Sequence, residues 1–400
     1  MKFGPMVVLV AGIYTGAFCQ SVWTKQNSGD TNTLTSVAWS GKIIVAVGGG
    51  GTILTSLDGI SWATQNSGTT GGLNSVIWAD SQFVAVGDYG TVLTSPNGLA
   101  WTAQPIAVST GFTLYSIAWS GTKYVAASNG GVGSGSGGII VTVISAPNNL
   151  NWSNSTITNV IYKIIWADSQ FIGVGSGSNY GGGNYMTSHD GVNWTLEIIG
   201  TSNTLTAVTW TDSLYVLVGY TSKAGLVQTS PDGVTWTAQN TSLVHALYSV
   251  IWSGYQLVSV GNDGYIATSP NGLNWSPQNS PTGNVLNSVV MAGNQFVAVG
   301  NGGTIITSQN TTSPILPKSS FQSTFSFHLS PTFLSFTLPN TFSNSSSTAA
   351  IYNLSGNRLI ESPISKSNFS MHIGNLGMGK YFLQIKDSKD KVVEPFEINR

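Results

Sequence analysis

The 400-residue sequence has little charge, one cysteine and two arginines, Arg358 and Arg400. Asp, Glu, Lys and Arg make up 7% of the residues, against about 25% in an average globular protein. The net charge of -1 gives no electrostatic reason to expect nucleic acid or an anionic membrane as a partner. Because Cys19 is the only cysteine, the chain cannot form an internal disulfide. Its stability must come from packing.

The shortage of ionisable side chains also narrows the possible chemistry. Residues 20–312 contain two histidines, His189 and His245, neither with a second ligand at metal spacing. We therefore expect no metal and no cofactor. The stretch GSGSGG at 133–138 matches GxGxxG, but IIVTVIS follows it, which is typical of a strand. A phosphate cradle needs a helix N-terminus there, so a hairpin loop is expected instead.

The N-terminus carries the one long apolar run, from about Phe3 to Phe18 after Lys2. This run is short for a membrane span, so residues 1–19 are predicted to be a secretory signal peptide, cleaved after Cys19. Lipid modification of Cys19 is the alternative. We predict a secreted, extracellular or outer cell-surface protein with no transmembrane span after signal removal, and expect a monomer.

Glycine and tryptophan are plentiful, with 48 and 13 residues, and the tryptophans mark a repeat. A phrase of the form LNSVIW occurs seven times, in steps of 39, 41, 47, 44, 42 and 39 residues counted from Trp39 to Met291. Each unit contains four short runs rich in β-branched and aromatic residues, separated by Asp, Asn and Gly. Such runs indicate strands and hairpins, and four strands per roughly 40 residues indicate a β-propeller blade.

The seventh unit lacks a fourth strand, whereas SVWTKQNSG at 21–29 matches the fourth strand of the other units. The N-terminal strand is therefore predicted to complete the last blade and close the ring. The predicted fold class is all-β, with a seven-bladed β-propeller over residues 20–312. A linker rich in Ser, Pro and Phe follows at 313–333, and then a small C-terminal β-sandwich at 334–400.

A second phrase, SPDGVTW at 230–236, recurs near the end of six units. It resembles the Asp-box (BNR-like) hairpin of propellers that include sialidases, xyloglucanase-type glycosidases and the photosystem II assembly factor. The resemblance implies a structural hairpin between the third and fourth strands, away from the substrate face. Its structural residues here are Ser56, Asp58, Gly59, Trp62, Asn97, Trp101, Asp190, Trp194, Asp232, Gly233, Trp236, Asn271 and Trp275.

The sequence argues against catalysis in the repeats. A sialidase needs several arginines to clamp the substrate carboxylate, and both arginines lie outside residues 20–312. Glycoside hydrolysis needs two facing carboxylates. Asp88 and Asp263 are weak candidates, because Asp is also an ordinary residue of hairpin turns. We predict a non-enzymatic binding or interaction module, with a polysaccharide-degrading glycosidase as the alternative.

Candidate binding residues lie in the loops between the second and third strands and near them. They are Tyr89, Tyr180, Tyr185, Tyr220, Lys223 and Asn262. Exposed Tyr and Asn on Gly-rich loops suit adaptable recognition of sugars or protein surfaces. The expected partner is a polysaccharide or a cell-surface protein, the latter for an assembly or adhesion factor. A purely structural role in tight turns is the competing reading for each residue.

The C-terminal residues resemble the sorting domain of type IX secretion. The matching stretches are IYNLSG at 351–356, followed by Arg358 and Leu359, and IGNLGMGKYFLQI at 373–385. The resemblance implies that the tail engages the type IX secretion machinery, and that the protein is then released or attached to the cell surface. An ordinary β accessory domain is the alternative.

Overall fold

The computed structural model describes most of the repeat region and part of the tail. Residues 1–21, which hold the predicted signal peptide, lie outside the described residues. The described ranges are 22–105, 113–129, 139–146, 149–156, 160–176, 183–198, 203–222, 224–309, 327–329, 333–337, 348–353, 358–364, 368–373, 376, 379–386 and 391–398. Within these ranges no helix is long and apolar enough to cross a membrane.

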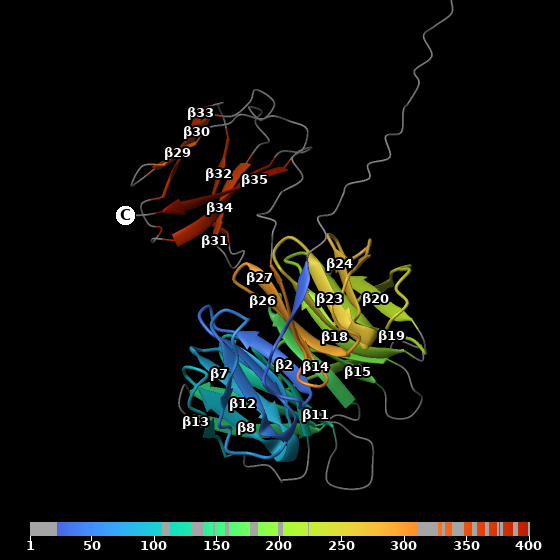
Figure 1. Ribbon diagram of the computed structural model, residues 1–400. Helices are drawn as coiled ribbons and strands as arrows, with labels where there is room; N and C mark the ends of the chain where they lie inside the picture. Colours follow the sequence, from blue (N-terminus) through green and yellow to red (C-terminus); the bar gives the residue numbers. More distant parts are fainter. Residues whose placement is uncertain are drawn as a thin grey trace, which may run out of the picture. The chain divides into compact units, whose positions relative to one another are not determined.

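The chain divides into two compact units, Met1–Thr312 and Ser313–Arg400. The described part of the first unit consists of seven four-stranded antiparallel sheets (Figure 1). Three sheets also contain a short 3-10 turn between the second and third strands: η1 (Gly49–Gly51), η2 (Asp88–Gly90) and η3 (Asn262–Gly264).

The strands follow the chain order within the first six sheets. Their bounds are β2 (Leu34–Trp39), β3 (Ile44–Gly48), β4 (Ile53–Ser56), β5 (Ala63–Gln65); β6 (Leu73–Ala79), β7 (Gln82–Gly87), β8 (Val92–Ser95), β9 (Thr102–Ala103); β10 (Thr113–Trp119), β11 (Lys123–Asn129), β12 (Ile139–Ala146), β13 (Asn149–Thr156); β14 (Val160–Ala167), β15 (Gln170–Ser176), β16 (Gly183–Ser188), β17 (Thr195–Ile198); β18 (Thr204–Trp210), β19 (Tyr215–Tyr220), β20 (Gly225–Ser230), β21 (Thr237–Ala238); β22 (Leu247–Trp252), β23 (Leu257–Gly261), β24 (Ile266–Ser269) and β25 (Ser276–Gln278).

The seventh sheet is built from both ends of the unit. It contains β26 (Leu286–Ala292), β27 (Gln295–Gly300), β28 (Ile305–Gln309) and, at its edge, β1 (Trp23–Gln26). Strand β1 pairs antiparallel with β28, from Trp23 opposite Ser308 to Gln26 opposite Ile305. In Figure 1 the blue start of the chain accordingly lies with the orange strands. This is the pairing that the sequence predicts.

The sheets form a closed ring through their first strands, here called the inner strands. These are β2, β6, β10, β14, β18, β22 and β26, and each packs against the next, with β26 returning to β2. Side chains fill the space between neighbouring sheets. In one such core, Val45 and Ile53 of the first sheet pack with Phe83 and Leu93 of the second. Because each inner strand and the strand next to it are covered on both faces, β3 and β7 read as nearly continuous apolar runs.

The hairpins between the third and fourth strands have the same geometry in five sheets. In the first, the Oδ1 atom of Asp58 accepts the backbone N–H groups of Ile60 and Ser61, both at 2.8 Å. Gly59 has φ 74°, a left-handed conformation that glycine adopts at little cost. The indole Nε1–H of Trp62 donates to the Gly59 carbonyl at 3.0 Å. The equivalent bonds recur around Asn97, Asp190, Asp232 and Asn271.

The hairpin carboxylates are stabilised in their charged form. Backbone N–H groups of Ser61 and Ile60 lower the pKa of Asp58, and those of Asn193 and Val192 lower the pKa of Asp190. The N–H groups of Thr235 and Val234 lower the pKa of Asp232 to about 2. Asn97 and Asn271 accept the same bonds without a charge, which identifies hydrogen-bond acceptance as what the turn requires.

The second unit contains two sheets. One has the order β29 (Phe327–Leu329), β30 (Phe333–Thr337), β33 (Asn368–His372), and the other β32 (Arg358–Pro363), β31 (Thr348–Asn353), β34 (Gly379–Lys386), β35 (Lys391–Ile398). Leu334 and Met371 from the first sheet share one buried core with Ile351 and Leu383 from the second. The two sheets therefore pack on each other.

Candidate ligand-binding face

One end of the first unit holds the turns between the second and third strands, and we call it the turn face. The hairpins around Asp58 and its equivalents lie at the opposite end, since they join the third and fourth strands. Each inner strand has one β-bulge residue near the turn face. In the first sheet it is Thr35, whose neighbour Leu34 pairs with Gly48 at the end of β3.

Four of these bulge residues connect neighbouring inner strands, and we call their position the latch position. Thr35 Oγ1 donates to the carbonyl of Leu73 at 2.5 Å, and Thr206 Oγ1 donates to that of Leu247 at 2.7 Å. The amides of Asn74 and Asn287 donate to the equivalent carbonyls of Leu114 and Leu34, at 3.1 and 2.8 Å. A small polar side chain at this position thus joins one sheet to the next.

Tyrosines occupy the latch position in the other three sheets: Tyr115, Tyr162 and Tyr248. The rings of Tyr115 and Tyr162 meet edge to face with centroids 5.9 Å apart. Tyr248 makes a similar pair with Tyr220 at the end of β19, at 6.0 Å. Tyr162 is exposed, and the others are partly exposed. Sequence reasoning missed the three latch tyrosines, although their alignment with Thr and Asn in the other repeats was a visible signal.

Tyr89 is the most exposed of those predicted binding residues that the structure describes. Its side chain is 73% exposed, and its backbone has φ 58° inside η2. The equivalent positions in the first and seventh sheets are Gly50 and Gly302, which adopt this left-handed conformation without a Cβ penalty. A bulky residue in this conformation costs of order 1–2 kcal/mol, and such strain is often found at functional sites.

Asp88 has a structural role in the second sheet. Its carboxylate accepts the backbone N–H of Gly72 at 3.0 Å, the amide of Asn74 at 3.2 Å and the hydroxyl of Thr113 at 3.2 Å. In the seventh sheet Asn301 takes the same place, and its Oδ1 accepts the amide of Asn287 at 3.0 Å. Since a neutral amide fills the same role, the geometry favours Asp88 as a turn residue rather than a catalyst.

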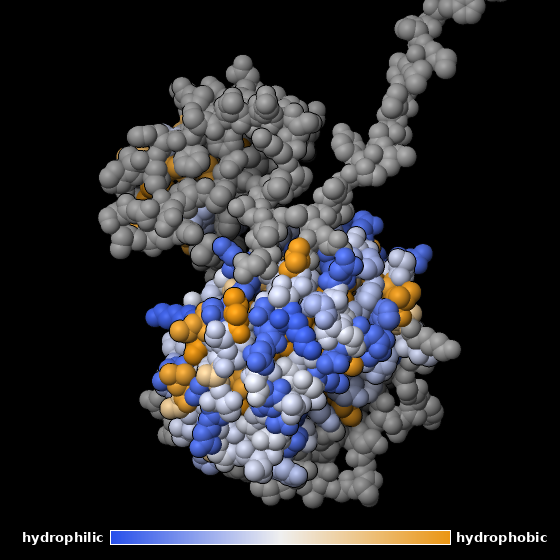
Figure 2. All heavy atoms as spheres, viewed as in Figure 1, coloured by the Kyte–Doolittle hydropathy of each residue, from blue (hydrophilic) through white to orange (hydrophobic). Residues whose placement is uncertain are grey.

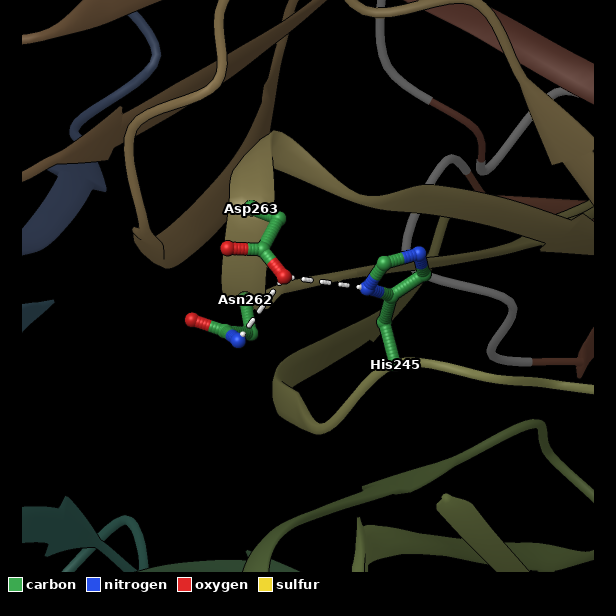
Figure 3. A network of polar contacts seen from close by, with 3 residues as sticks. All are labelled: His245, Asn262 and Asp263. Atoms are coloured by element: carbon green, nitrogen blue, oxygen red, sulfur yellow. Dashed lines mark hydrogen bonds and ion pairs between the residues drawn. The ribbon is translucent and has the colours of Figure 1, made fainter. Parts of the chain in front are cut away.

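Asp263 belongs to a polar cluster at the sixth sheet (Figure 3). Its Oδ2 atom accepts the amide of Asn262 at 3.0 Å and lies 3.3 Å from Nδ1 of His245. The His245 ring also lies 4.7 Å from the ring of Tyr265, measured between centroids. Asp263 occupies the left-handed second position of its turn, whereas Asp88 occupies the first position of its own. The two candidate carboxylates are therefore not equivalent in the ring.

The polar cluster and the tyrosine pair affect one another electrostatically. Burial, together with the nearby Tyr220 and Asp263, raises the pKa of Tyr248. Burial also raises the pKa of Tyr265. Both phenols therefore stay protonated at neutral pH and can donate hydrogen bonds. The structure thus brings together the predicted residues Tyr220, Asn262 and Asp263 with two residues that sequence reasoning did not select, Tyr248 and His245.

The remaining predicted binding residues fall elsewhere. Tyr185 is a correction: its side chain is 5% exposed in the core between the fourth and fifth sheets, and its hydroxyl donates to the carbonyl of Val234. The residue lies within β16 instead of in the preceding loop, so its ring packs against Trp236. Tyr180 and Lys223 lie outside the described residues. Among the described residues no three His, Cys, Asp or Glu side chains gather as they would around a metal.

Comparison with known protein families identifies a sorting domain in the tail. Residues 331–399 match the secretion system C-terminal sorting domain. The protein is therefore secreted or on the cell surface. This sorting domain belongs to type IX secretion, as the motifs at 351–356 and 373–385 predict. A comparison with curated proteins finds no match.

Two solved structures resemble the chain. One is PorZ of Porphyromonas gingivalis, described as an essential surface component of the type IX secretion system, with a TM-score of 0.53 and 13% identity. The likeness covers 91% of this chain but only 59% of PorZ. The other is the WD40 β-propeller domain of Doa1, with a TM-score of 0.55, 12% identity and coverage of 73% and 99%. At such low identity these likenesses support the β-propeller fold and carry no function.

Proposed function

We propose that residues 20–312 form a seven-bladed Asp-box β-propeller that binds a saccharide outside the cell without cleaving it. The seven ring-connected sheets and the five matching hairpins support this architecture. Residues 334–400 then form a small β-sandwich that the type IX machinery recognises, after a linker at 313–333. Removal of residues 1–19 as a signal peptide belongs to the same proposal.

The tyrosines at three latch positions carry the binding proposal. In four sheets this position holds a Thr or Asn that donates to the neighbouring inner strand, whereas the other three sheets have a tyrosine there. What it provides instead is an aromatic face beside the turn face. Aromatic rings stack on the apolar faces of sugar rings, and the phenol and nearby amides bond to sugar hydroxyls.

The test replaces the tyrosines with Asn, the residue that the second and seventh sheets have at the latch position. The chain from residue 20 carrying Tyr115→Asn, Tyr162→Asn and Tyr248→Asn is mixed with insoluble plant and microbial polysaccharides, and the protein left in the supernatant is measured. Wild type should be depleted by at least one polymer, with binding weakened at least tenfold in the variant. New reducing ends in the wild-type tubes would contradict the non-enzymatic proposal.

The control changes three exposed apolar residues at the opposite end, by Ile60→Asn, Leu99→Asn and Val234→Asn. Each of these side chains follows the glycine of its hairpin and is about half exposed. This variant should bind polysaccharide like wild type. Retained binding in the tyrosine variant, or equal loss in both variants, would show that the turn face is not the saccharide site.

A protein partner is a second candidate, favoured by exposed aliphatic side chains at the end opposite the turn face. They recur at one position of the hairpin in five sheets, at Ile60, Leu99, Val192, Val234 and Leu273. On the face drawn in Figure 2, apolar side chains form several small groups among polar ones. Exposed apolar groups with polar rims are typical of protein interaction surfaces. Failure of every polysaccharide to bind wild type would favour this candidate.

A further inference from the structure

The chain segment that connects the fifth sheet to the sixth carries two of the aromatic and polar residues of the turn face. Tyr220 ends β19 of the fifth sheet and pairs with Gly225, the first residue of β20. The N–H of Gly225 donates to the carbonyl of Leu243 in the connecting segment at 3.1 Å. The ring of Tyr248, at the end of this segment, meets that of Tyr220 edge to face at 6.0 Å. The segment is therefore held against the fifth sheet by backbone and ring contacts.

The turn η3 of the sixth sheet is held against the same segment. The N–H of Asn262 donates to the carbonyl of Ala246 at 2.9 Å. Asp263 follows in the chain, and its Oδ2 atom lies 3.3 Å from Nδ1 of His245. Besides burial and a neighbouring phenol, the charge of Asp263 raises the pKa of Tyr248. These contacts join five side chains into what we call the boundary cluster: Tyr220, His245, Tyr248, Asn262 and Asp263.

The carboxylate of Asp263 has one oxygen that the protein does not use. Both of its contacts within the described residues, from His245 and Asn262, go to Oδ2. In Figure 3 the other oxygen, Oδ1, points away from His245. The side chain is 63% exposed, and no lysine or arginine of the described chain forms an ion pair with it. Asp88, in contrast, accepts three hydrogen bonds from its own and the next sheet.

A carboxylate beside a pair of tyrosine rings suits a cation. A protonated amine donates to a carboxylate oxygen and is attracted to the electron-rich face of a tyrosine. A neutral hydroxyl can also donate to Oδ1, but a bond between two charged groups is roughly twice as strong. An anion would be repelled by the charge of Asp263. The chemistry of the cluster therefore favours an ammonium group over a hydroxyl or an anion.

We propose that the boundary cluster binds the protonated amine of an amino sugar, with Asp263 as the counter-ion and the Tyr220–Tyr248 pair as the aromatic contact. This inference rests on the proposed saccharide function, because Tyr248 is one of the latch tyrosines, and it names the class of saccharide. Acetylation of the amine removes its charge, so the free amino sugar binds more tightly than its N-acetyl form.

The test compares chitosan with chitin, two insoluble polymers of the same sugar with a largely free or an acetylated amine. The chain from residue 20 is mixed with increasing amounts of each polymer at neutral pH, and the protein left in the supernatant is measured. Asp263→Asn removes the charge, and asparagine adopts the left-handed backbone of this turn, with φ 52°, at little cost. The matched control is Asp88→Asn, which removes a carboxylate from another turn of the same face, where the seventh sheet has Asn301.

Wild type and Asp88→Asn should bind chitosan about five- to tenfold more tightly than chitin, whereas Asp263→Asn should bind the two polymers within about twofold. Tyr220→Leu keeps an apolar side chain without an aromatic face, so it should reduce the preference for chitosan by about two- to threefold. Glucosamine should release wild type from chitosan, and N-acetylglucosamine at matched ionic strength should not.

Three results would overturn the proposal. One is an unchanged preference for chitosan in Asp263→Asn. Another is an equal loss in Asp263→Asn and Asp88→Asn, which would show nonspecific attraction to a polycation. The third is release from chitosan by the amide of Nα-acetyl-lysine but not by glucosamine, which would assign the cluster to an amine of a protein.

The amine proposal and the saccharide proposal fail in different ways. If wild type binds chitin or another neutral polysaccharide and shows no preference for chitosan, only the amine proposal fails. If wild type binds no polysaccharide at all, both proposals fail.

Discussion

Replacing Trp23 should reveal how much the closure of the ring contributes to stability. Trp23 is the first residue of β1, is 6% exposed, and stacks on Phe296 with ring centroids 6.1 Å apart. Apart from Trp23, the residues of β1 are exposed or partly exposed, so this side chain supplies most of the apolar contact that holds the strand.

The cost follows from the burial. A tryptophan buries roughly 200 Å², worth about 5 kcal/mol at 25 cal/mol per Å², and Trp→Ala in a core costs about 3–5 kcal/mol. Trp23→Ala should therefore lower the free energy of unfolding by about 3–5 kcal/mol. That is a large fraction of the 5–15 kcal/mol typical of whole domains. Trp23→Phe keeps an aromatic ring against Phe296 and should cost less than half as much.

Urea unfolding followed by tryptophan fluorescence measures this change in the first unit alone. All 13 tryptophans lie between Trp23 and Trp275, so the second unit contributes no signal. Val22→Ala is the control, because Val22 is 70% exposed next to the same strand. A loss below about 1 kcal/mol for Trp23→Ala, or a loss equal to that of Val22→Ala, would refute the reasoning.

Three further outcomes are expected. Tyr89→Gly should raise the free energy of unfolding by about 0.5–1 kcal/mol, because relief of the left-handed strain exceeds the entropic cost of glycine. The same variant should bind polysaccharide more weakly. A lower stability of the variant in urea unfolding would contradict this. Asp58→Asn should leave stability at pH 7 nearly unchanged, because Asn97 accepts the same bonds, whereas Asp58→Ala should show an earlier urea midpoint. The folded protein lowers the pKa values of Asp58, Asp190 and Asp232. The ionised carboxylates therefore stabilise the first unit fully above their unfolded pKa of about 4, and this stabilisation is lost as the pH falls toward 2. Acid unfolding of the first unit should then occur at a lower pH when all three residues are Asn.

The repeat made most of the first unit predictable from the sequence. The period, the strand-like runs and the turn residues recur in each unit, so a strand that is wrongly assigned in one repeat can be corrected by comparison with the others. The match of 21–29 to a fourth strand predicted the β1–β28 pairing for the same reason. The tail motifs were specific enough to name the sorting domain, which the family comparison confirms.

The site was harder to predict because it depends on departures from the repeat. Tyr185 was assigned to a loop by its Gly-rich surroundings, but β16 begins at Gly183, which places the ring in the core. The latch tyrosines were visible in the alignment of repeats. Their meaning required the hydrogen bonds between inner strands, which no single repeat reveals.

The seventh sheet also sets the order in which the first unit can finish folding. The Gln26 side chain donates to the hydroxyl of Thr307 at 2.8 Å, across 281 residues of sequence. Such a distant contact carries a large loop-closure cost and forms late. A chain being exported cannot complete its last sheet until both ends have emerged on the same side of the membrane. The shared sheet therefore couples completion of folding to completion of transport.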